Sequence, residues 1–218
     1  MARRLPCRAA LAVLAPSALA LVVACSPGAP SSGEAMKAPG AGTERQPPST
    51  VSAPPGRVTL GPYTQVFATA MPADPAQAAV IADFRTATIL WDQSGEELAM
   101  VPPVRSYVTG SAVSNLERFL SAEAEEHFVL VGTDTLFRTR ATISGDTDAA
   151  VTTCDDSSKA TTRDTRTGAV ASMPPLSKQY AISTWGMTRI AGHWAISSVQ
   201  VATLPAAAAR TCQPAAAR

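Results

Sequence analysis

The run QYAISTWGMTRIAGHWAISSVQVAT, residues 179–203, decides the fold. Apolar and polar residues alternate in each half of this run, which is the pattern of a half-buried β-strand. The halves meet at Ala191 and Gly192, residues suited to the tight turn of a β-hairpin. In the second half the parity of the apolar residues changes between Ile196 and Val199, which predicts a β-bulge there. We therefore expect two antiparallel strands at the end of the folded part.

Two more strands are expected before this hairpin. Thr- and Val-rich segments at 135–143 and 149–162 are separated by Ser-Gly-Asp at 144–146, which is typical of a turn. The Asp-Asp-Ser-Ser run at 155–158 is a poor strand interior, so a bulge or a solvated turn is expected at that point.

Helical periodicity precedes the strands. Apolar residues recur at helical spacing over 75–92, with Asp74 as the N-cap and Pro75 in the first helical position. A short helical piece is predicted at 103–108 and a second long helix at 111–127. The inner face of that second helix is predicted to carry Val113, Leu116, Leu120 and Ala124. Helices followed by antiparallel strands indicate an α+β domain.

Three segments resemble one known family, namely TCDDS at 153–157, DTRTG at 164–168 and TRIAGHWAI at 188–196. Together they are similar to secreted and lipid-anchored bacterial proteins with a nuclear transport factor 2-like domain, a branch found in high-GC Gram-positive bacteria. The resemblance covers residues 75–203. It implies N-terminal helices packed in a strongly curved antiparallel sheet, which forms a cone with a pocket at its open end. It implies no particular activity, because most members of this branch have none assigned.

The first 24 residues have the features of a secretory signal peptide. Three arginines among the first eight residues precede an uncharged, mostly apolar run at 9–24. That run is shorter than the roughly twenty residues that a spanning helix needs, and Pro16 interrupts it. A permanent transmembrane anchor is therefore the weaker interpretation.

The end of the apolar run is more specific than a general signal peptide. The sequence LVVAC at 21–25 is similar to the lipobox of bacterial lipoproteins. The resemblance implies cleavage between Ala24 and Cys25 and a diacylglyceryl group on the Cys25 sulfur. Two acyl chains would hold the protein on the extracytoplasmic face of the cell membrane. The alternative is an ordinary cleaved signal peptide with an incidental cysteine.

The rest of the chain divides by composition. Residues 25–62 are rich in Pro, Ser, Gly and Ala and bury too little apolar surface to offset the entropy of ordering. We expect them to form a disordered tether after the lipidated cysteine; a loop packed on the domain is the alternative. Residues 63–204 suit a single domain, and residues 205–218 form an Ala-rich tail.

Cys154 and Cys212 are the two cysteines that remain after the expected cleavage and lie beyond the anchor. Export places them in an oxidising environment, where an even pair is expected to form a disulfide. Two separate thiols are the alternative. A metal site is not expected, because the chain has only two histidines, His127 and His193, and neither lies at ligand spacing from a cysteine.

Few residues have the pattern of a catalytic site. Asp155 and Asp156 are adjacent, so on a strand their carboxylates point to opposite faces and share a site only if a bulge intervenes. Trp91, Tyr107 and Tyr180 are candidates to line the pocket, although packing also explains such residues. No nucleophile, phosphate-loop or dinucleotide motif is present. We therefore predict no catalytic residue and no cofactor.

Composition narrows the function classes. A formal net charge of +1 and an aromatic content of 5% leave no basic field and no stacking platform for nucleic acid. Our main hypothesis is a non-catalytic module that binds an envelope protein or a cell-wall component. A carrier or sensor of a small apolar ligand is the second hypothesis, and an enzyme such as an isomerase or hydrolase is the third.

Overall fold

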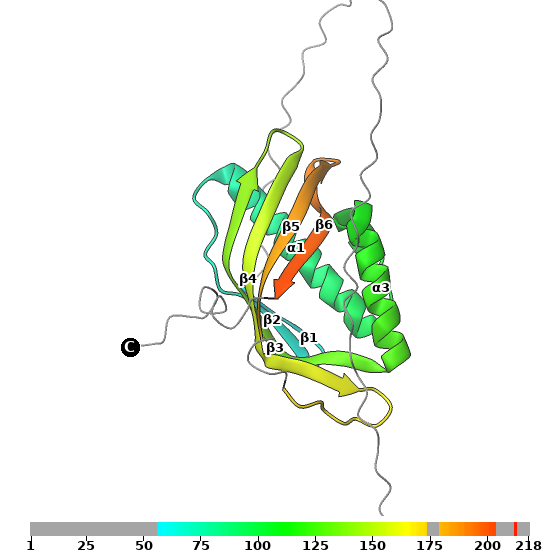
Figure 1. The fold of residues 1–218 in the computed structure, drawn as a ribbon. Helices are drawn as coiled ribbons and strands as arrows, with labels where there is room; N and C mark the ends of the chain where they lie inside the picture. The colour runs from blue at the N-terminus through cyan, green and yellow to red at the C-terminus, as the bar shows by residue number, and fades with distance from the viewer. Residues whose placement is uncertain (1–55, 174–178, 204–211, 213–218) are drawn as a thin grey trace, which may run out of the picture. The chain divides into compact units, whose positions relative to one another are not determined.

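The computed structural model describes residues 56–173, 179–203 and Cys212, and within them it has three helices and a six-stranded sheet (Figure 1). In chain order the elements are β1 (Arg57–Leu60), β2 (Tyr63–Phe67), α1 (Pro75–Glu97), α2 (Val104–Tyr107), α3 (Gly110–Glu126), β3 (Phe128–Ile143), β4 (Asp148–Asp164), β5 (Tyr180–Ile190) and β6 (His193–Thr203). The predicted α+β class is confirmed. None of the described helices is long and apolar enough to cross a membrane. Ala24, Cys25 and most of the tail lie outside the described residues.

The sheet has the strand order β1-β2-β3-β4-β5-β6, and one pair departs from the prediction. β2 and β3 pair in parallel, whereas every other neighbouring pair is antiparallel. The chain leaves β2, passes through all three helices and returns as β3, and a crossover of that length permits parallel pairing. β1 corrects the predicted tether, because residues 57–60 belong to the sheet. A four-residue strand directly after Pro54-Pro55-Gly56 gives little periodicity to recognise.

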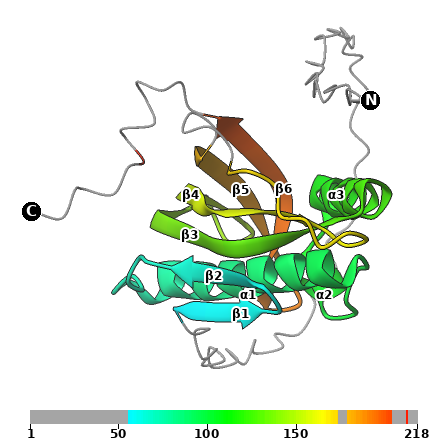
Figure 2. The same cartoon turned by 90° about the horizontal axis from the view of Figure 1, so that it is seen from below.

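Both predicted bulges are present. In the β3–β4 pair the register shifts between Thr133 and Thr135, so that Asp134 faces the two-residue segment Ser157-Ser158. In the β5–β6 pair Ser197 is the extra residue between two paired positions. Bulges bend the strands that carry them. Figures 1 and 2 show β3 and β4 bending together, with α1 running across the sheet.

α1 begins as predicted and ends five residues later than predicted. The Asp74 side chain accepts a hydrogen bond of 2.8 Å from the Gln77 amide. The helix continues through Ser94 because its buried hydroxyl donates to the Leu90 carbonyl and accepts from the Val101 amide. These two bonds offset the low helix propensity of Ser94 and of Gly95, which follows it.

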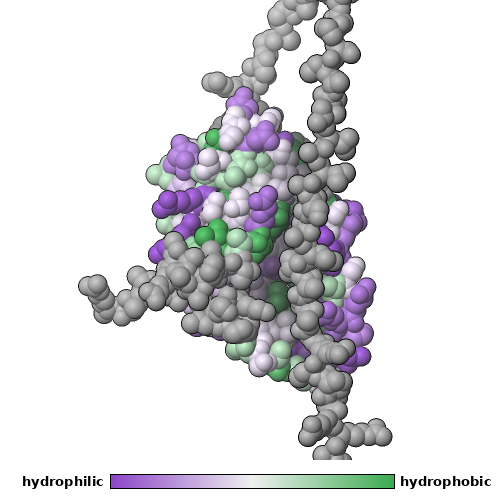
Figure 3. Space-filling view, in the orientation of Figure 1, coloured by the Kyte–Doolittle hydropathy of each residue, from purple (hydrophilic) through white to green (hydrophobic). Residues whose placement is uncertain are grey.

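α3 shows one error in the predicted inner face. Leu116 and Leu120 are buried, as expected, but Ala124 is exposed and Glu123 is fully buried in its place. Glu123 lies against Gly95 of α1: a Cβ atom added to Gly95 would be 3.1 Å from Oε2 of Glu123. The opposite side of α3 is hydrophilic (Figure 3), as an amphipathic surface helix requires.

Candidate functional site

A cavity of about 130 Å³ lies between α1 and the inner face of the sheet. Its walls come from five elements and consist of Tyr63, Gln65, Thr88, Trp91, Asp92, Asp134, Leu136, Asp155 and Trp185. Strand alternation explains part of this set. Val151 and Thr153 of β4 are fully buried, so Asp155, with the same parity, also faces inward. Thr88, Trp91 and Asp92 lie three and four residues apart, on one face of α1.

Three aspartates from three elements converge on this cavity. Asp134 accepts hydrogen bonds from the Thr135 amide (2.9 Å) and the Ser157 hydroxyl (3.2 Å). The Tyr63 hydroxyl donates to the other carboxylate oxygen of Asp134 at 3.5 Å. Asp155 accepts a hydrogen bond from the Ser183 hydroxyl. The hydrogen-bond partners that these two carboxylates have among the described residues are therefore all neutral.

Burial and mutual repulsion disfavour the charged form of these aspartates. Desolvation raises the pKa of Asp134 to about 6 and that of Asp155 to about 7. The pKa of Asp92 lies well above its usual range because of desolvation, and the charges of Asp134, Glu123, Glu96 and Asp155 raise it further. Desolvation and the Asp92 charge also raise the pKa of the Tyr63 phenol. The protonated, neutral form of these carboxyl groups is therefore favoured over a wider pH range than in an exposed aspartate.

Several buried polar atoms around the cavity find no hydrogen-bond partner among the described residues. They are Gln65 Oε1, Asp92 Oδ2, Asp155 Oδ1 and Trp185 Nε1. Gln65 is only 4% exposed. An unpartnered buried polar group costs about 1–3 kcal/mol, so several of them around one cavity favour a polar occupant, either water or a ligand.

Aromatic side chains form the other part of the wall. The rings of Trp91 and Trp185 meet edge to face, with centroids 6.0 Å apart. Phe84 is fully buried and also packs against Trp185, with the centroids of the two rings 5.6 Å apart. The two indoles are therefore held in place by core packing as well as by each other.

A larger groove of about 340 Å³ adjoins the cavity. Tyr63 and Asp134 line both spaces. The other walls of the groove are mostly small or apolar and consist of Leu130, Ser157, Ala160, Thr161, Thr162, Ala171 and Ser172. Here β5 no longer pairs with β4, and residues 169–171 hydrogen-bond to β4 in its place. A ligand with a polar head and an apolar extension can therefore occupy both spaces.

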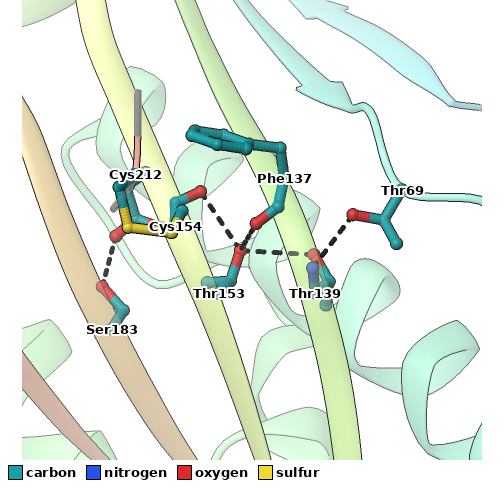
Figure 4. Close-up of a disulfide and its surroundings, with 8 residues drawn as sticks. Thr69, Phe137, Thr139, Thr153, Cys154, Ser183 and Cys212 are labelled. Atoms are coloured by element: carbon teal, nitrogen blue, oxygen red, sulfur yellow. Dashed lines mark hydrogen bonds between the residues drawn. A yellow bond between two sulfur atoms is a disulfide. The ribbon is translucent and has the colours of Figure 1, made fainter. Parts of the chain in front are cut away.

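Figure 4 shows the disulfide at Cys154 of β4, together with Thr153 of the same strand. Cys154 and Cys212, the pair that the sequence favours, are joined, with Cα atoms 5.4 Å apart. Cys154 stands between Thr153 and Asp155 on β4, so its side chain points to the opposite face of the sheet from theirs. The Thr153 hydroxyl lies 3.2 Å from that of Thr139, which ties β4 to β3 beside the bridge.

The structure places the three predicted pocket residues in different surroundings. Trp91 lines the cavity. Tyr107 lies in α2 against the His193 ring, at 4.9 Å, and lines neither space. Tyr180 pairs with Asp156 at the start of β5 and lines neither space. Only Trp91 of the three therefore lies beside the aspartates of the cavity.

The prediction for Asp155-Asp156 is right for one residue only. Asp156 accepts a hydrogen bond from the Ser158 amide, which is the local turn contact expected of a bulge. Asp155 is instead paired in the strand opposite Ala181 and faces the cavity. The bulge begins beyond Asp155, at Ser157, so the strand alternation still applies to Asp155.

Sequence reasoning missed most of the polar lining of the cavity, including Tyr63, Gln65, Asp92 and Asp134. One signal for Asp92 existed, because it follows Thr88 by four residues and Phe84 by eight, which places a carboxylate on the apolar face of the helix. Nothing comparable marks Asp134. Among the residues that the structure describes, no group of three His, Cys, Asp or Glu side chains could hold a metal ion.

The raised pKa values predict that the fold becomes less stable as pH rises. The folded-state pKa of Asp155 is about 7 and that of Asp134 is about 6, whereas an unfolded aspartate titrates near about 3.9. The folded chain therefore binds more protons than the unfolded chain between roughly pH 4 and 7, and the free energy of unfolding falls over that window. Glu123, with a pKa of about 8, extends the fall to higher pH.

Asp155→Asn is the variant that isolates this effect. We expect it to raise the free energy of unfolding at pH 8 by on the order of 1–3 kcal/mol and to change it little at pH 4. Urea unfolding at both pH values measures the difference. Asp148→Asn, at an exposed position on the same strand, is the control. Equal stability of Asp155→Asn and the wild type at pH 8 would contradict the assigned environment.

The comparisons with known proteins leave the family open. No family model matches the chain, and no curated protein matches it. Among solved structures, the crystal structure of the intermembrane space region of the chloroplast protein ARC6 is similar at 16% sequence identity and a TM-score of 0.38. The match covers 62% of this chain and 100% of that chain. A likeness of this degree assigns neither a family nor an activity, so function has to be argued from the chain's own residues.

Proposed function

We propose that the protein is a lipid-anchored binding module on the extracytoplasmic face of the cell membrane, and that its cavity holds a small ligand. The observation that carries the ligand is the set of unpartnered polar atoms around one cavity. The lipobox-like sequence ending at Cys25 supports the anchor, and the resemblance over 75–203 supports a nuclear transport factor 2-like cone. A six-stranded sheet bent around a long helix is compatible with that cone.

The ligand that fits differs from the one that the sequence suggests. A wholly apolar molecule does not suit the inner cavity, because it would leave Gln65 Oε1, Asp92 Oδ2 and Asp155 Oδ1 without polar partners. It suits only the adjoining groove. A docking surface for an envelope protein or a cell-wall component has less support, since the atoms that lack partners face inward rather than outward.

General acid–base chemistry is a second candidate function. Asp155, with a pKa of about 7, and Asp134, with a pKa of about 6, are both suited to exchange a proton near neutral pH. An isomerase or hydrolase could use such a pair. The binding function is preferred because it needs no assumption about a reacting group of the ligand.

Native mass spectrometry of the full chain, purified in mild detergent from its own host, tests the proposal. We expect a non-covalent adduct on the wild type that Thr88→Leu removes, because the larger side chain extends into the cavity that Thr88 lines. Thr86→Leu is the matched control. Like Thr88→Leu, this variant deletes a hydroxyl that donates to a backbone carbonyl of α1, but Thr86 does not line the cavity.

Two results would count against binding in this cavity. The first is an adduct that persists at equal occupancy in Thr88→Leu. The second is the reproducible absence of any adduct on wild type and Thr86→Leu alike.

A further inference from the structure

We infer that the inner cavity binds a small organic cation, specifically a primary alkylammonium group, which its three aspartates and aromatic walls together select. This inference rests on the proposed function, because it names the class of ligand for the same cavity.

Charge is the first argument. Asp92, Asp134 and Asp155 come from α1, β3 and β4 and meet at one space, and the described groups that donate to them are hydroxyls and an amide. A buried carboxylate without a cation is costly, and it becomes stable when an opposite charge arrives. A monovalent cation in the cavity supplies that charge.

The pattern of free acceptors is the second argument. Gln65 Oε1, Asp92 Oδ2 and Asp155 Oδ1 are buried acceptors that lack a donor among the described residues. A primary ammonium has three N–H donors and no acceptor, as in the lysine side chain. Its donor count therefore matches the number of free acceptors, which an anion or an ether would leave unsatisfied. The fourth unpartnered atom, Trp185 Nε1, is a donor and is not paired by an ammonium.

The aromatic walls are the third argument. Trp91 and Trp185 line the cavity together with Tyr63. A cation within about 6 Å of an aromatic face is attracted by the ring quadrupole, and tryptophan gives the strongest attraction. The aromatic groups also supply apolar contact for the first carbons of an alkyl chain.

The volume of the cavity limits the size of the part of the ligand that it can hold. A cavity of about 150 Å³ accommodates benzene in another protein, so the space of about 130 Å³ suits a molecule of about five non-hydrogen atoms. Butylammonium has this size. A longer chain can continue past Tyr63 and Asp134 into the groove, where Leu130, Ala160 and Ala171 offer apolar contact.

Tryptophan fluorescence of the full chain in detergent tests the inference. Two of the three tryptophans, Trp91 and Trp185, line the cavity, whereas Trp194 is buried in the core. The probes are butylammonium, the neutral analogue 1-butanol, the anion butyrate and calcium ion, each titrated at pH 8. We expect a saturable change with butylammonium, at least about tenfold weaker binding of 1-butanol, and no change with butyrate or calcium.

Two variants locate the binding. Asp92→Asn and Asp155→Asn are each expected to weaken butylammonium binding by about tenfold, since each removes one charge from the cavity. Asp148→Asn, at an exposed position of β4, is expected to change it by less than about twofold. If one of the two aspartate variants fails to fold, the other one still tests whether the cation binds in the cavity.

The outcomes separate this inference from the proposed function. If 1-butanol binds as tightly as butylammonium and Thr88→Leu abolishes both, the cavity binds ligands but does not select cations. If butylammonium binds equally to wild type, Asp92→Asn and Asp155→Asn, the cation site lies elsewhere and the inference is wrong. If no probe binds and no adduct is found by mass spectrometry, both the inference and the proposed function fail.

Discussion

Cys25→Ala is expected to abolish lipid modification completely. In the proposed anchor the diacylglyceryl group is attached through the cysteine sulfur, and alanine offers no nucleophile in its place. Intact mass spectrometry of detergent-extracted protein measures the result. We expect the wild type to be the cleaved chain with a lipid adduct, and Cys25→Ala to lack that adduct.

Membrane partitioning follows from the same change. Each buried CH₂ group of an acyl chain contributes about 0.8 kcal/mol to membrane binding. A single myristoyl chain binds only reversibly, with an association constant of roughly 10⁴ M⁻¹, whereas two chains form a stable anchor. Cys7→Ala is the matched control, because Cys7 lies inside the expected signal peptide and its loss should leave the lipid in place. A Cys25→Ala chain that still carried diacylglycerol would disprove the anchor.

The second large effect is expected from Cys212→Ser. The disulfide joins residues that are 58 positions apart, and in the chain-entropy model such a bridge stabilises the fold by about 4 kcal/mol. For a domain of this size that loss corresponds to a fall in Tm of about 8–16 °C. Cys154 and Cys212 are both buried, so the variant would also leave a free Cys154 thiol and a serine hydroxyl shielded from water, which adds to the loss of stability.

Calorimetry with and without reductant measures this effect. Reductant should lower the Tm of the wild type toward that of Cys212→Ser and leave the variant unchanged. A Tm of oxidised Cys212→Ser within about 2 °C of the wild type would show that the bridge contributes little. Since Cys154 adjoins Asp155 on β4, loss of the bridge should also weaken ligand binding in the cavity.

The elements that sequence reasoning predicted correctly are those with strong local periodicity. The helix at 75–92 and the hairpin at 179–203 repeat their apolar residues often enough to identify both type and position. The bulge near Ser197 could be predicted because the parity of the apolar residues changes on either side of it. Short strands such as β1 have too few repeats for this approach.

The candidate site could not be predicted, because no local pattern brings its residues together. Asp92 and Asp134 are 42 positions apart, and Asp155 follows 21 positions later. Asp134 and Asp155 meet through the β3–β4 pairing, and Asp92 joins them because α1 packs against the sheet. Asp134 and Asp155 each resemble an ordinary surface residue, and only Asp92 is marked in the sequence, by its place on the apolar face of a helix. Their burial depends on a bulge and a crossover, and both follow from tertiary packing rather than from local sequence.

The central claim is that a buried cavity with three aspartates is the functional site. The most direct test is a pH titration of the full chain, labelled with ¹³C at the aspartate carboxyl carbons and followed by NMR with and without butylammonium. The account predicts that Asp155 titrates with a pKa of about 7, and that this pKa falls when the cation is present, because a bound positive charge favours the carboxylate. Asp155→Asn assigns the signal. An Asp155 signal that titrates near about 4 and does not respond to butylammonium would contradict the account.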